Sequence, residues 1–182
     1  MCGAAGVRRF TVDTTMAAWH LAQINVGRLI APNDSPIVAE FVNALDRINA
    51  VADASPGFIW RLQSDSGNAL DIVVTDDPQM AVNMSVWEDA DALFAYVYRS
   101  VHTPFMAQRK SWFERFSGAY QALWWVPAGT IPTVDEGLSR LWRLDRFGPT
   151  AQAFTFKTQF PAPGQLGLPR DMQPDPWCEG RA

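Results

Sequence analysis

HLAQINV, residues 20–26, decides the fold because its side chains alternate in character. Three apolar side chains lie on one side of an extended chain, and Gln23 and Asn25 lie on the other. Alternation with a period of two predicts a β-strand with one buried face. Four further segments show strand character: 58–63, 81–87, 122–126 and 154–160. The sequence therefore predicts a sheet whose two faces differ.

Three helices are expected between these strands. Their predicted ranges are 36–52, 89–116 and 133–147. Ser35 is placed to cap the first helix, and Thr133 with Glu136 forms a capping-box pattern at the start of the third. In the second, Pro104 is expected to break or kink the helix before its period resumes.

The order of these elements predicts an α+β fold. It reads β-α-β-β-α-β, followed by an extra C-terminal helix and strand, and the first six elements spell the ferredoxin-like split βαβ arrangement. That arrangement is an antiparallel sheet with helices on one face. We expect one domain over residues 19–163, a flexible N-terminal segment at 1–18 and a Pro/Gly-rich tail at 164–182.

Composition narrows the class of protein. The chain has 182 residues and a formal net charge of −4, so it carries no broad basic surface for nucleic acid. No apolar run is long enough to cross a membrane, and no export signal is evident at the start. Cys2 and Cys178 stand far apart in the sequence, which argues against a disulfide framework. A cytoplasmic protein is expected.

The polar face of the predicted sheet is the candidate site. If the helices cover the apolar side, period-two geometry gathers carboxamides, a cation and indoles on the other. Its members are Gln23, Asn25, Arg61, Gln63, Asn83, Ser85, Trp87 and Trp125. Packing this face against the same face of a second subunit would enclose a mixed cavity suited to a small apolar or aromatic molecule. The alternative is a solvated face with ordinary polar residues.

Helix 89–116 contributes a second set of candidates. If it stays roughly straight through Pro104, one stripe collects five side chains, which are Tyr98, His102, Phe105, Arg109 and Trp112. His102 titrates near neutral pH and is a candidate general base or haem ligand, with a helix cap or structural histidine as the alternative. Arg61 is the candidate for holding an anionic or enolate oxygen.

Several segments together resemble one protein family. They are HLAQINVGRL, SGNALDIVVTDDP, VNMSVWED, YVYRSVHTPFMAQRKSWFERF, ALWWVPAGTIPTVDE and FGPTAQAFTFKTQFPAP. Over residues 20–163 the chain resembles the domain-of-unknown-function family 3291. This resemblance implies a dimeric α+β barrel, a superfamily that includes cofactor-free antibiotic-biosynthesis monooxygenases and haem-degrading monooxygenases. It supplies neither a reaction nor a catalytic motif.

Three functions compete at this point. The first is a cofactor-independent monooxygenase or related oxidoreductase acting on an aromatic or polyketide-like molecule in the homodimer's cavity. There, Arg61 and the carboxamides Asn25 and Asn83 would bind an oxyanion, His102 would take the proton, and Trp87 and Trp125 would stack on the ring. Gln23, Ser85, Tyr98 and Arg109 complete the predicted substrate-binding set. The second is a non-catalytic small-molecule-binding module, or a haem protein with His102 as ligand. The third is a purely structural dimer. No metal or other cofactor is expected, because the sequence lacks the corresponding motifs.

Overall fold

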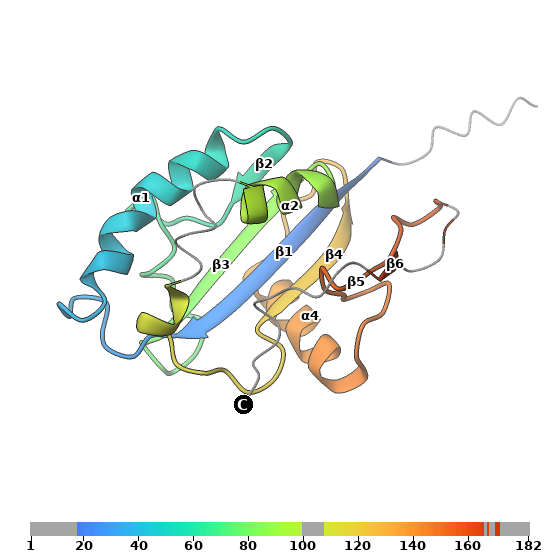
Figure 1. The fold of residues 1–182 in the computed structure, drawn as a ribbon. Coiled ribbons are helices and arrows are strands. Elements are labelled where there is room, and N and C mark those ends of the chain that lie inside the picture. The colour runs from blue at the N-terminus through green and yellow to red at the C-terminus, as the bar shows by residue number, and fades with distance from the viewer. Residues whose placement is uncertain (1–17, 100–107, 166, 168–169, 172–182) are drawn as a thin grey trace, which may run out of the picture.

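The computed structural model describes residues 18–99, 108–165, 167 and 170–171. Its centre is a four-stranded antiparallel sheet in the order β2-β3-β1-β4. The strands are β1 (Trp19–Arg28), β2 (Phe58–Arg61), β3 (Met80–Trp87) and β4 (Gln121–Pro127). This is the strand order of the ferredoxin-like fold, so the predicted fold class is confirmed (Figure 1).

The register between β1 and β3 places polar residues opposite polar residues. Gln23 lies opposite Ser85, and Asn25 lies opposite Asn83. Because β1 and β3 pair residue by residue without a shift, Gln23 and Asn25 of β1 share a face with Asn83 and Ser85 of β3. The predicted polar face therefore exists.

Helices cover both faces of the sheet. They are α1 (Ala39–Asp53), α2 (Ala90–Arg99) and α4 (Val134–Phe147). Ala52 of α1 and Leu93 of α2 pack with Leu21 and Trp87, whose side chains lie on the same face as Gln23. Figure 1 shows α1 and α2 together on one side of the strands. The expectation that these two helices cover the apolar side is therefore wrong.

The apolar face is covered by α4 instead. Leu141 and Leu144 of this helix join a buried cluster with the apolar residues of β1, β3 and β4. Gly137 allows the close approach, because a Cβ atom there would lie 2.7 Å from Ile24 Cδ1. A helix packed this tightly leaves little space for polar groups, which explains why the centre of this face is apolar.

The start of α4 confirms half of the capping-box prediction. Thr133 Oγ1 accepts a hydrogen bond from the backbone N–H of Glu136 at 3.1 Å. The Glu136 carboxylate does not reach back, because it accepts from Trp124 Nε1 at 3.0 Å and from Arg140 Nη2 at 2.8 Å. Trp124 is fully buried, so the Glu136 carboxylate pairs with a polar group of the core as well as with a side chain of its own helix.

The predicted ends of the first two helices differ from those in the structure. Helix α1 begins at Ala39 rather than 36, because residues 36–38 form turns and the side chain of Ser35 only accepts from Ile37 N within that turn. In the predicted helix 89–116, α2 ends at Arg99. Residues 108–116 hold one 3-10 turn, η1 (Arg109–Ser111), so in this described stretch the α-helix does not resume. Residues 100–107, with His102, Phe105 and Pro104, lie outside the described residues.

The predicted strand 154–160 is mostly irregular. Phe154 exchanges two backbone hydrogen bonds with Leu123 at the free edge of β4, and the chain then turns. A short strand, β5 (Thr158–Gln159), pairs with β6 (Arg170–Asp171) in a separate two-stranded sheet. Most of the predicted terminal segments 1–18 and 164–182 lie outside the described residues. Among the described residues, none of the helices is both long enough and apolar enough to cross a membrane.

Candidate functional site

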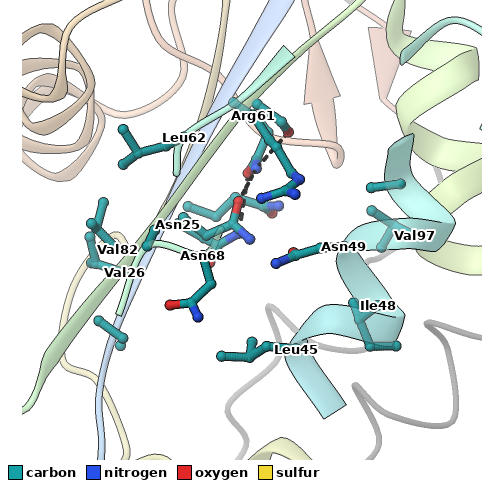
Figure 2. A pocket seen from close by; sticks show the side chains of 18 of the residues that line it. Asn25, Val26, Leu45, Ile48, Asn49, Arg61, Leu62, Asn68, Val82 and Val97 are labelled. Atoms are coloured by element: carbon teal, nitrogen blue, oxygen red, sulfur yellow. Dashed lines mark hydrogen bonds between the residues drawn. The ribbon is translucent and has the colours of Figure 1, made fainter. Parts of the chain in front are cut away.

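A cavity of about 160 Å³ lies between the polar face of the sheet and helices α1 and α2. The sheet contributes Gln23, Asn25, Asn83, Ser85 and Trp87 to its floor. The helices contribute the opposite wall, and Figure 2 shows Leu45, Ile48 and Val97 facing the strands across it. Helices α1 and α2 therefore lie opposite the polar face, where the polar face of a second subunit was expected.

The floor of the cavity is a connected hydrogen-bond network with Gln23 at its centre. Gln23 Nε2 donates to Asn83 Oδ1 at 3.0 Å and to Ser85 Oγ at 2.9 Å, and Gln23 Oε1 accepts from Asn25 Nδ2 at 3.2 Å. Trp87 Nε1 also donates to Ser85 Oγ, at 2.8 Å. Gln23 and Ser85 are only 5% and 6% exposed. The network satisfies the buried polar atoms and fixes the side chains that border the cavity.

Carboxamides also enter the cavity from outside the sheet. Asn49 comes from α1 and Asn68 from the connection between β2 and β3, and Figure 2 shows both near Asn25. Asn68 Oδ1 accepts from Leu70 N at 3.0 Å, whereas the side chain of Asn49 forms no hydrogen bond with another described residue. The sequence analysis missed both. The available signal was Asn49 itself, a polar residue four positions after Leu45 on the inward face of an amphipathic helix.

Aromatic rings form much of the rest of the wall. Tyr96 stacks on Trp87 with ring centroids 5.1 Å apart, and burial raises the pKa of Tyr96 above its usual range, so its phenol stays protonated. Trp112 and Phe113 pack against Phe41 of α1, with centroid distances of 5.8 Å and 4.9 Å. The cavity therefore combines flat apolar walls with directed amide groups, which is typical of a small-molecule site.

Arg61 lies on the cavity wall but is committed to protein partners. Its Nε donates to Asp53 Oδ1 at 2.8 Å, and its Nη1 donates to the carbonyl oxygen of Gly67 at 2.8 Å. A guanidinium held by a carboxylate and a carbonyl is a poor site for a further anion. Arg61 therefore links Asp53 at the end of α1 to Gly67 in the connection after β2.

Arg109 is the second cation on the wall, and its surroundings differ. Its guanidinium lies 5.2 Å from the centroid of the Phe113 ring and 4.7 Å from that of Tyr120. Its Nη2 donates to the carbonyl oxygen of Val26 at a long 3.4 Å. Burial lowers the pKa of this guanidinium, which still stays protonated at neutral pH.

The predicted site residues are largely brought together. Those that line the cavity are Gln23, Asn25, Arg61, Asn83, Ser85, Trp87, Tyr98 and Arg109. Trp125 does not line it, because its indole is covered by the C-terminal segment and donates to the carbonyl oxygen of Phe160 at 2.8 Å. His102 lies outside the described residues. The described lining contains no Asp, Glu, His, Lys or Cys.

Comparisons with known proteins find a family match and similar solved structures. Residues 20–168 match the family described as a domain of unknown function (DUF3291). Among solved structures, SnoaB, a cofactor-independent oxygenase from Streptomyces nogalater, is similar at 19% identity and a TM-score of 0.41, covering 63% of this chain and 98% of that one. A protein of unknown function from Nitrosomonas europaea is similar at 13% identity and a TM-score of 0.41, covering 64% and 98%. No curated protein matches the chain.

Proposed function

The chain belongs to the DUF3291 family, and from this premise we propose that the protein binds a small planar organic molecule in the cavity between its sheet and helices α1 and α2. The observation that carries the proposal is the lining itself. Amide groups of Asn25, Asn49 and Asn83 converge on a space walled by aromatic and aliphatic side chains. Of these amides, those of Asn25 and Asn49 are half-buried and that of Asn83 is exposed, and polar groups around an open volume are suited to a ligand that supplies hydrogen bonds.

The size of the cavity limits the ligand. A cavity of about 150 Å³ accepts one benzene ring, and this one measures about 160 Å³. The ligand that fits is therefore a one-ring molecule rather than the polycyclic polyketide considered from the sequence. A haem does not fit this space, because its macrocycle is far larger than one ring.

Filling the cavity tests the proposal. The Asn49→Phe variant places a ring in the space without breaking a hydrogen bond to another described residue, so it should fold and lose binding. The matched control is Asn43→Phe, at an exposed position of the same helix. Isothermal titration with benzoate and benzamide, and native mass spectrometry of freshly purified protein, measure occupancy. Equal binding by Asn49→Phe and the control would place the ligand elsewhere, and no binding by the wild type would refute the function.

A cofactor-independent oxygenase is the second candidate. The feature in its favour is a ring-sized space whose wall carries amide donors and a cation, because such chemistry must bind an ionised substrate and exclude water. A base is also required, and His102 is the residue proposed for that role from the sequence. Oxygen uptake with phenolic substrates, compared between the wild type and His102→Ala, tests this candidate. Uptake that is equal in both removes His102 from the mechanism.

A further inference from the structure

Arg109 is a cation on the cavity wall without an acidic partner in the described part of the chain. Of the four ion pairs among the described residues, none includes Arg109. Residues 100–107, which precede it in the sequence, contain no Asp or Glu. Arg61, the other arginine on the wall, is neutralised by Asp53. The charge of Arg109 is therefore not balanced by any described neighbour.

Withdrawing a guanidinium from water is costly unless another charge or a set of hydrogen bonds replaces the solvent. The rings of Phe113 and Tyr120 supply part of this stabilisation through their π-faces. The only hydrogen bond to a described residue is the long one to Val26. Most of the guanidinium's five N–H donors thus remain available for a ligand.

The backbone of β1 makes room for this arrangement at Gly27. A Cβ atom on Gly27 would lie 2.7 Å from Phe113 Cδ1 and 3.1 Å from Arg109 Nη2. Gly27 follows Asn25 by two residues, so the two lie on the same face, about 7 Å apart along the strand. The cation is therefore placed at the end of the carboxamide row, within the length of one small molecule.

We propose that the ligand is a one-ring organic carboxylate whose anionic group pairs with Arg109 while its ring lies over Asn25 and Asn83. This inference rests on the proposed function and adds the chemical class of the ligand. The planar fork of a guanidinium matches the two oxygens of a carboxylate. Asn83 Nδ2 donates to no described residue, so it is available as a further donor.

The test compares a charged ligand with its neutral counterpart. Benzoate and benzamide share their ring and nearly their shape, and differ in charge. Isothermal titration of the wild type should give tighter binding of benzoate by at least about tenfold, because a desolvated charge pair contributes strongly to affinity. Arg109→Gln should remove this preference. The control Arg47→Gln, at an exposed position of α1, should retain it.

A second variant covers the case in which Arg109→Gln does not fold. Gly27→Ala keeps the arginine but displaces it together with Phe113, so the preference for benzoate should shrink. Circular dichroism checks that each variant is folded. Equal binding of benzoate and benzamide by the wild type would overturn the carboxylate assignment and leave the cavity as a neutral binding site. Failure of both probes to bind would overturn the proposed function as well.

Discussion

Replacing Gln23 with Met should destabilise the fold, because it removes the residue at the centre of the hydrogen-bond network on the cavity floor. Gln23 is 5% exposed and makes three side-chain hydrogen bonds, to Asn83, Ser85 and Asn25. Each is worth about 1 kcal/mol net. Asn83 is exposed and can be rehydrated, which reduces the expected loss to about 2 kcal/mol. With a urea m value of about 2 kcal/mol/M, the midpoint of unfolding should fall by about 1 M.

The control for this prediction is Asn83→Ala, which removes one partner of the same network. Because Asn83 is exposed, its loss should cost well under about 1 kcal/mol, while Gln23 keeps its bonds to Ser85 and Asn25. Urea unfolding followed by tryptophan fluorescence measures both variants. If Gln23→Met were no less stable than Asn83→Ala, the network would not be a source of stability, and its role in fixing the cavity floor would be refuted.

Two further changes test the core and the response to acid. Glu136→Leu leaves the buried indole N–H of Trp124 unpaired and should cost about 1–3 kcal/mol in urea unfolding, whereas Glu136→Gln keeps an acceptor and should cost less; equal losses would contradict this. The backbone N–H of Gln79 and then the side chain of Arg28 lower the pKa of Asp77 below its ordinary 3.8. A depressed pKa stabilises the fold above the ordinary value, and this stability is lost as pH falls through the lowered value. Asp77→Asn should therefore melt at a lower temperature than the wild type at pH 6, with a smaller difference at pH 2; a constant difference would rule out the linkage.

The sheet could be predicted from the sequence because its signal is local. Alternation in β1, β3 and β4 located three strands to within about two residues, since each strand has one face against an apolar core. The start of α4 at Thr133 and its end at Gly148, which has φ +72°, follow the same local rules. Such signals depend on a few neighbouring residues rather than on contacts with distant parts of the chain.

The segment after α2 could not be predicted in this way. Its apolar spacing suggested one long helix, yet Trp112 and Phe113 pack against Phe41 and the guanidinium of Arg109 reaches Val26. These contacts lie far along the chain from Arg109, and they determine a conformation that helix propensity alone would not select. Within the described residues 108–116 the chain forms the 3-10 turn η1 instead of the α-helix that was expected to align the candidate residues.

The prediction of which elements cover the polar face was wrong for a different physical reason. Alternation shows that the two faces of a sheet differ, but it does not show which helix lies on which face. A strictly apolar face indicates tight packing, which α4 provides through Gly137. A face with a polar centre indicates a gap beneath its covering helices, and α1 and α2 leave one. The polar side chains were expected to face a second subunit, whereas helices α1 and α2 lie over them.

Ligand binding and association of two copies can be tested separately. The described lining of the cavity comes from this chain, and the homodimer stays a prediction. Both faces of the central sheet are already covered, by α1 and α2 on one side and α4 on the other. Ligand affinity that stayed constant on dilution across the association range would fit a site complete within one chain, and affinity that fell with dilution would show that a second copy contributes to it.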